Sequence, residues 1–145
     1  MASTTRLSIV TPEGTKYEGD VEIVIAPGAA GDLAALPNHA PLLTTLRPGL
    51  VVAKSAAAAD RAELEAETGT RFAVDGGFMQ VMPDRVIVLS DRAVAHNEVD
   101  VETARRDHQR ALEALAEKKG VDDAAERVAV AFSDAMLKLA GRSPD

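Results

Sequence analysis

The sequence predicts a protein of two parts: an N-terminal antiparallel β-sandwich in residues 1–97 and a C-terminal antiparallel two-helix hairpin in residues 98–145. Before Asn97, short β-branched runs alternate with glycine and proline turns. Many short strands at close spacing are typical of a sandwich or barrel. After Asn97, glycine and proline almost vanish and apolar residues recur every three or four positions, as in amphipathic helices. Two such helices joined by a short connection form a hairpin.

Seven strands are predicted in the first part. They are Arg6–Val10, Val21–Ala26, Leu50–Lys54, Arg71–Val74, Phe78–Met82, Arg85–Leu89 and Arg92–Ala95. Turns such as Pro12-Glu13-Gly14 and Asp75-Gly76-Gly77 separate these runs. The continuous apolar run Val86-Ile87-Val88-Leu89 predicts a strand that is buried on both faces.

The segment Ser55–Thr70 fits two structures equally well. Ala56–Ala59 and the charged residues that follow have helix propensity. Glu63–Glu67 also alternates like a strand, and Thr68-Gly69-Thr70 could form a turn, so an elongated β-hairpin is the second alternative. In either structure we expect the segment to project from the sandwich into solvent.

The predicted helices have recognisable ends. Asp100 suits the N-cap of the first helix, and Gly120 suits the position after its C-terminus. Asp123 with Glu126 resembles a capping box for the second helix. The first apolar stripe is Val101, Ala104, His108, Ala111 and Leu115, and the second is Ala125, Val128, Phe132, Ala135, Met136 and Leu139. Because alanine buries little apolar area, we expect a weakly held, movable hairpin.

Composition excludes several classes of function. Aromatic residues make up 3% of the chain and the net charge is −7, so nucleic-acid binding is not expected. The chain has no cysteine, which excludes disulfides and thiolate metal sites. Met1–Thr5 lacks a signal-peptide core, and no apolar run approaches the roughly 20 residues that span a bilayer. We therefore expect no direct insertion into a membrane.

The most distinctive motif is Leu36-Pro37-Asn38-His39-Ala40-Pro41-Leu42, a histidine between two prolines. Each proline fixes its own φ and disfavours helix before it, so the motif displays His39 on a stiff segment. A hydrolase that uses His39 is one alternative, but no nucleophile motif, phosphate loop or metal-ligand spacing accompanies it. We therefore predict no catalytic residue, metal or cofactor, and interpret the motif as a contact with a partner.

The ordered motifs resemble those of the epsilon subunit of F-type ATP synthase, of the bacterial or chloroplast type. The matching stretches are Leu7–Gly14, Gly31–Leu33, Leu36–Leu42, Leu46–Gly49, Asp75–Phe78 and Val86–Asp91, followed by the two helices. The resemblance implies a sandwich of two five-stranded sheets and a non-catalytic rotor subunit of the central stalk. It also implies coupling of proton-driven rotation to ATP synthesis, at the cytoplasmic face of the bacterial inner membrane or the stromal face of the thylakoid.

The resemblance also implies partners and contact residues. The gamma subunit and the c-subunit ring would bind at Asp32, Leu33, Pro37, Asn38, His39, Pro41 and Leu42, with Asp32 facing the c ring and His39 near gamma. The hairpin of many members inhibits ATP hydrolysis at the alpha and beta subunits. Basic residues that could serve such contacts here are Arg105, Arg106, Arg110, Arg127 and Lys138.

One family feature is altered in this chain. Some members bind ATP at the hairpin, and Asp100 and Arg110 are the matching candidates here. Thr103 replaces the arginine of that motif, so we predict no regulatory ATP site. A free-standing sandwich module with another acidic or apolar partner is the alternative to the rotor subunit.

Overall fold

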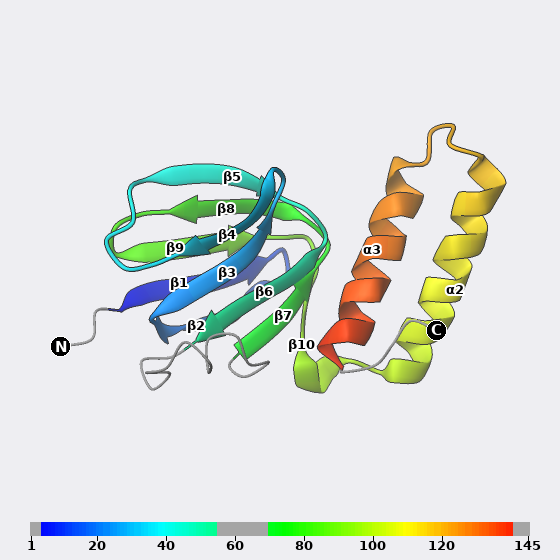
Figure 1. Ribbon diagram of the computed structural model, residues 1–145. Helices are drawn as coiled ribbons and strands as arrows, with labels where there is room; N and C mark the ends of the chain where they lie inside the picture. The colour runs from blue at the N-terminus through cyan, green and yellow to red at the C-terminus, as the bar shows by residue number, and fades with distance from the viewer. Residues whose placement is uncertain (1–3, 55–69, 141–145) are drawn as a thin grey trace.

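The computed structural model describes residues 4–54 and 70–140, and shows a β-sandwich beside a helical hairpin (Figure 1). The strands are β1 (Thr5–Thr11), β2 (Gly14–Val21), β3 (Ile23–Gly28), β4 (Gly31–Ala35), β5 (Leu42–Leu46), β6 (Gly49–Lys54), β7 (Thr70–Val74), β8 (Gly77–Val81), β9 (Arg85–Leu89) and β10 (Ala93–Ala95). They are followed by the 3-10 helix η1 (His96–Glu98) and by the helices α2 (Val101–Lys118) and α3 (Ala124–Leu139). The predicted fold class is confirmed, and η1 spans the position where the sequence divides the two predicted domains.

The strands form two five-stranded halves of one hydrogen-bonded sheet, with β4 paired to β3 beside the main strand order. The first half has the order β10-β7-β6-β3-β4 and the second has the order β5-β8-β9-β1-β2. Within residues 4–54 and 70–140, one registered pair, Gly28 with Leu46, connects the halves. All neighbouring strands are antiparallel except β1 and β9, which run parallel. The expectation of a wholly antiparallel sandwich therefore differs from the structure at this one pairing.

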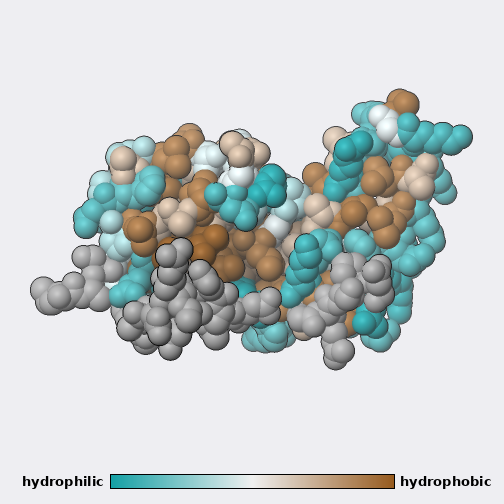
Figure 2. Space-filling model, in the orientation of Figure 1, coloured by the Kyte–Doolittle hydropathy of each residue, from teal (hydrophilic) through white to brown (hydrophobic). Residues whose placement is uncertain are grey.

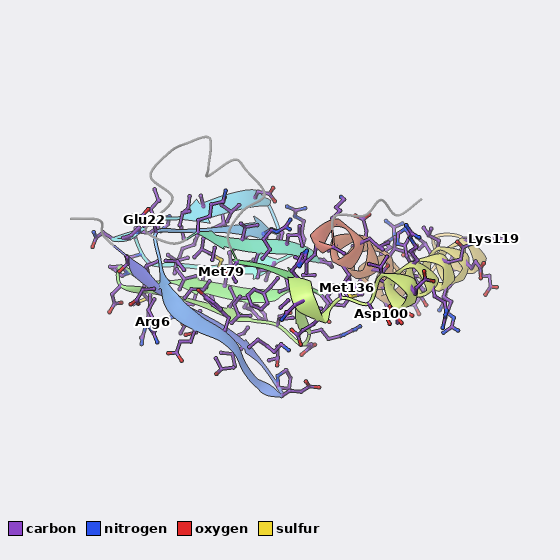
Figure 3. The ribbon with its side chains drawn as sticks, turned by 90° about the horizontal axis from the view of Figure 1, so that it is seen from below. Arg6, Glu22, Met79, Asp100, Lys119 and Met136 are labelled. Carbon is purple, nitrogen blue, oxygen red and sulfur yellow. The ribbon has the colours of Figure 1, made fainter. Side chains whose placement is uncertain are left out.

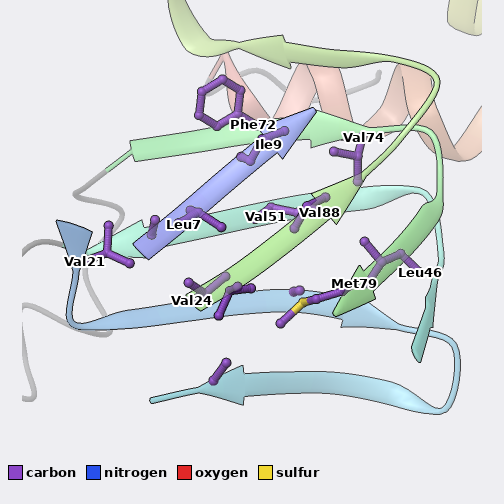
Figure 4. Packing of buried hydrophobic residues seen from close by; sticks show 14 of the residues in the cluster. Leu7, Ile9, Val21, Val24, Leu46, Val51, Phe72, Val74, Met79 and Val88 are labelled. Carbon is purple, nitrogen blue, oxygen red and sulfur yellow. The ribbon is translucent and has the colours of Figure 1, made fainter. Parts of the chain in front are cut away.

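The sandwich core lies between the two halves and is built from small branched residues (Figure 4). Leu7 and Ile9 of β1 are 0% exposed, and Ser8 between them is only partly buried, which is the alternation of a half-buried strand. Met79 of β8 and Val88 of β9 are also fully buried and face the same core. Aliphatic side chains thus fill a core in which aromatic residues are scarce.

Three strands were not predicted, and one was predicted with the wrong burial. The sequence of β2 is rich in polar residues, β4 lacks β-branched residues, and β5 falls partly inside the proline motif. In β9, Val86 and Val88 are fully buried, whereas Leu89 is 49% exposed. The prediction of burial on both faces is therefore wrong, because no helix in the described part of the chain covers the outer face of this half.

The hairpin docks through α3, which lies between the sandwich and α2 (Figure 3). The predicted cap at Asp100 is confirmed: its Oδ1 accepts hydrogen bonds from the backbone N–H groups of Glu102 and Thr103 at 3.1 and 3.4 Å. The predicted capping box at Asp123 is wrong, because this side chain makes no capping bond and accepts one from Arg127 Nε at 3.0 Å. Gly120 follows α2 with a φ of 81°, as expected for this position.

The packing of α3 is less alanine-rich than the sequence suggests. A second core cluster joins the hairpin to the outer face of β7, and its buried members are Ala73, Ala104, Phe132, Ala135, Met136, Leu137 and Leu139. Leu137 was not in the predicted stripe, whereas Ala125 and Val128 of that stripe are exposed. The expectation of uniformly weak packing is therefore wrong for the C-terminal half of α3. The two alternatives for Ser55–Thr70 lie outside the described residues, apart from Thr70 at the start of β7.

Candidate functional site

The proline motif connects β4 to β5 and is fixed against the turn between β8 and β9. The Asn38 N–H donates to the Pro83 carbonyl at 2.8 Å, and the His39 N–H donates to the Leu36 carbonyl at 3.2 Å. Asn38 has a φ of 64°, a left-handed conformation that asparagine tolerates better than most residues. The backbone of the motif is therefore held in one shape, as its two prolines predict.

The His39 side chain makes a local contact. Its Nδ1 lies 2.6 Å from the carbonyl oxygen of Ala40, which can only accept, so Nδ1 carries the proton. Within the part of the chain that the structure describes, no nucleophile or carboxylate bonds to this ring. The geometry gives His39 no partner for acid–base or nucleophilic chemistry.

Asp32 and Leu33 lie at the other end of β4 from the proline motif. The Asp32 carboxylate is 73% exposed and pairs with Arg47 Nη2 at 2.5 Å. Arg47 Nε also donates to the Gly28 carbonyl at 2.8 Å, which ties the pair to the end of β3. Leu33 is half-buried and packs against the sandwich core. Because β4 rises about 3.3 Å per residue, the predicted contact residues form two separate groups.

An exposed apolar surface lies on the outer face of the second half of the sandwich and was not predicted. We call Leu43, Phe78 and Leu89 the outer apolar face; their exposed fractions are 70%, 52% and 49%. The strand register places them on one side, since Phe78 is opposite Leu89 and Leu43 lies two residues from the partner of Phe78. Patches of this kind on a protein surface are typical of binding sites. In the sequence Phe78 and Leu89 stand beside apolar residues such as Met79 and Val88, so no pattern distinguished these outward-facing side chains from the buried ones.

Two hollows in the protein surface lie next to the outer apolar face and the Asp32–Arg47 pair, respectively. One, of about 380 Å³, is bordered by Phe78 and Leu89 together with Pro12, Asp75 and Asp91. A second, of about 430 Å³, lies between the sandwich and α3 and includes Asp32, Arg47 and Lys138. Figure 2 shows apolar side chains over β3 and β6 on this side, next to the charged exterior of the hairpin. Asp32 therefore lies close to α3 when the hairpin is docked.

The predicted basic contact residues of the hairpin are all exposed. Arg127 pairs with Asp123 at 3.0 Å, and Lys138 pairs with Asp134 at 3.0 Å, each one turn apart on α3. The other three lie on α2 and are Arg105, Arg106 and Arg110. The Arg127 and Lys138 side chains are 68% and 63% exposed, and surface pairs within one helix contribute about 0.3–0.5 kcal/mol.

The two nucleotide candidates are not brought together. The Asp100 carboxylate also accepts from the Thr103 hydroxyl at 3.0 Å. This bond and the backbone N–H groups of the cap hold the pKa of Asp100 below its usual value. Arg110 lies ten residues further along the same helix, roughly 15 Å from the cap at 1.5 Å per residue. Asp100 is thus committed to helix capping.

Two negative findings concern only the residues that the structure describes. No group of three or more histidine, aspartate or glutamate side chains is arranged to hold a metal ion among them. None of their helices is long and apolar enough to cross a bilayer.

Comparison with known proteins identifies the relatives of this chain. Residues 4–96 match the model of the ATP synthase delta/epsilon chain β-sandwich domain. The chain is 42% identical over 136 residues to the ATP synthase epsilon chain of Moorella thermoacetica, covering 93% of this chain and 95% of that protein. It is 38% identical over 142 residues to the epsilon chain of Desulforamulus reducens, covering 96% and 97%.

Solved structures agree with the fold. A chain of the Euglena gracilis mitochondrial ATP synthase, solved with its F1 part and c-ring, matches with a TM-score of 0.65 and 17% identity. The match covers 94% of this chain and 78% of that chain. A chain of the Tetrahymena thermophila mitochondrial ATP synthase, from its central stalk and c-ring, gives a TM-score of 0.52 and 17% identity, covering 94% and 93%. At this identity the likeness extends to the fold alone.

Proposed function

The chain belongs to the family of ATP synthase epsilon chains, which makes it a non-catalytic subunit of that complex, and we propose that it works in the rotor by binding the gamma subunit and the c-subunit ring. These contacts couple proton-driven rotation to ATP synthesis. The subunit would then sit at the membrane surface, on the cytoplasmic face of a bacterial inner membrane or the stromal face of a thylakoid. The free-standing module is not favoured, because the relatives match over nearly the whole chain.

The outer apolar face is the observation that carries the assignment of gamma. It presents Leu43, Phe78 and Leu89 to solvent, and because each is already partly buried, covering the rest would stabilise an interface by part of the about 1.5–3 kcal/mol that full burial contributes. The 380 Å³ hollow beside Phe78 could accept an apolar side chain of the partner. The proline motif is fixed to Pro83, in the turn between β8 and β9, so His39 lies on the same half of the sandwich but at the opposite end of these strands from the Phe78–Leu89 pair.

The group around Asp32 is the candidate for the c ring. Its exposed carboxylate lies on a short hairpin end and is held by Arg47. A partner loop with polar or basic residues could share this pair. The separation of Asp32 from His39 along β4 supports contacts with two different partners at the two ends of the sheet.

The hairpin would act as the regulatory part of the subunit. We assign inhibition of ATP hydrolysis to a released form in which Arg105, Arg106, Arg110, Arg127 and Lys138 meet the alpha and beta subunits. Their exposure supports this role. No regulatory ATP is part of the proposal, because Thr103 replaces the arginine of the ATP motif and Asp100 caps α2.

The gamma assignment is tested by placing a charge on the outer apolar face. Phe78→Asp should weaken gamma binding more than tenfold, measured by titrating purified gamma subunit, because burying an unpaired carboxylate in an apolar interface is strongly unfavourable. The matched control is Val121→Asp, which changes a still more exposed apolar residue at the hairpin tip. Binding of the Phe78→Asp variant at the wild-type level would contradict the assignment.

A further inference from the structure

A cation–aromatic contact joins the sandwich to the hairpin. The Cζ atom of Arg92, which lies between β9 and β10, is 4.5 Å from the centre of the Phe132 ring on α3. Phe132 is only 3% exposed and belongs to the second core cluster. The ion pairs among residues 4–54 and 70–140 do not include Arg92. The ring of Phe132 is therefore the group that the guanidinium meets.

The backbone of Arg92 is fixed by the neighbouring turns. Its N–H donates to Asp75 Oδ1 at 3.1 Å, and its carbonyl accepts from the Asp75 N–H at 3.3 Å. The Ser90 hydroxyl lies 2.9 Å from both that carbonyl and Asp75 Oδ1, and its single proton serves one of them at a time. Asp75 and Ser90 thus hold residue 92 in place from the β7–β8 and β9–β10 connections.

Among the described residues, two further polar links between the two parts lie away from the middle of α3. Arg71 Nη2 is 3.5 Å from the Leu139 carbonyl at the last turn of α3, and Lys16 pairs with Glu98 of η1 at 2.9 Å. Among these links, Arg92 alone reaches the middle of α3 from the sandwich. Because α2 contacts the sandwich mainly through α3, a residue that grips α3 holds both helices.

We propose that Arg92 is a clamp that keeps the helical hairpin docked on the sandwich, and that Asp75 and Ser90 position it. A planar guanidinium over an aromatic ring is favourable, and arginine suits such stacking better than lysine. The clamp goes beyond the rotor role, because it concerns the resting position of the hairpin and requires no partner. Its test can therefore fail or succeed independently of gamma binding.

The test measures hairpin docking in the full-length chain. Because the chain has no cysteine, a donor and an acceptor dye can be attached to single cysteines introduced at Gln80 and Gln109, both exposed. Energy transfer at urea concentrations below sandwich unfolding then gives the ratio of docked to released hairpin. Arg92→Gln should lower this ratio about two- to fivefold, the size of an exposed cation–aromatic contact. The matched control Arg85→Gln, on exposed β9 surface, should leave it unchanged.

A double-mutant cycle separates the clamp from a general loss of structure. In a Phe132→Leu background, Arg92→Gln should have little further effect, whereas full additivity of the two changes would overturn the clamp. Arg92→Lys should restore part of the docking. Ser90→Ala should lower docking in the wild-type background but not with Arg92→Gln; an equal loss in both backgrounds would refute its positioning role. Equal ratios for Arg92→Gln and Arg85→Gln would refute the proposal as a whole.

Discussion

Truncating Leu137 should release the helical hairpin and leave the sandwich folded. Leu137 is 0% exposed and packs in the second core cluster with Ala73 of β7. It takes no part in the cluster between the two halves of the sandwich. Leu→Ala at fully buried sites destabilises by about 2–5 kcal/mol, because transfer and cavity terms add. The lost contacts join α3 to the sandwich, so the truncation destabilises the docking of the hairpin and not the fold of the sandwich.

The assay is native-state hydrogen exchange followed peptide by peptide. A loss of about 2 kcal/mol corresponds to a roughly 30-fold fall in protection, and larger losses to correspondingly larger falls. We expect this fall in peptides from α2 and α3. Peptides from β1 and β9, whose residues Leu7 and Val88 are fully buried in the other cluster, should keep their protection.

Leu112→Ala is the matched control. The chemical change and the change in helix propensity are the same, but Leu112 is 44% exposed on α2 and should cost less than about 1 kcal/mol. Equal falls in strand and helix peptides for Leu137→Ala would refute the reasoning, because the hairpin would then not open as a separate unit. Equal effects of the two variants would also refute it, because buried packing would not be what holds α3.

Three further predictions follow from the same contacts. Deletion of residues 100–145 should leave a sandwich that unfolds cooperatively in urea; a gradual transition would contradict this. A hydrogen bond from the Lys16 side chain and, to a smaller extent, one from the Ala95 N–H lower the pKa of Glu98. The stability that the ionised Glu98 contributes is therefore present above its unfolded pKa of about 4.3 and is lost as the pH falls through its folded pKa. We therefore expect the free energy of unfolding, measured in urea between pH 6 and 3, to fall more in the wild type than in Lys16→Met. The difference should be at most about 1 kcal/mol for so exposed a pair. Titration calorimetry with millimolar ATP should give no saturable heat, whereas a saturating isotherm would reverse our interpretation of Thr103.

Local signals in the sequence predicted local structure well. The Asp100 cap needs only its own carboxylate and the next backbone N–H groups, so it could be assigned without knowledge of the tertiary fold. The stiff proline motif likewise follows from covalent geometry. By contrast, Asp123 fits the capping pattern but bonds to Arg127, because a side chain one turn further along competes for its carboxylate.

Tertiary environment decided what the sequence could not. The run Val86–Leu89 is apolar at every position, and sequence alone does not reveal whether its second face meets a helix, a partner or solvent. For the same reason the outer apolar face was missed, since Leu89 was predicted to be buried and no face was assigned to Phe78. The separation of Asp32 from His39 also required the register of β4, because the segment Gly31–Ala35 has no β-branched residue and was not predicted as a strand.

The two halves of the sandwich differ in what covers them, and this links hairpin release to partner binding. The outer row Leu50, Ala73 and Val94 of the first half is covered by α3, whereas Phe78 and Leu89 on the second half are open. Release of the hairpin would expose that covered row together with the apolar side of α3. Exposing this apolar surface to water costs free energy in proportion to its area. A partner that covers both surfaces would therefore favour the released state over the docked one. A ligand shifts such an equilibrium only by its difference in affinity for the two states. A subunit that binds through the second half alone would leave the hairpin docked, and one that also contacts α3 would draw it away.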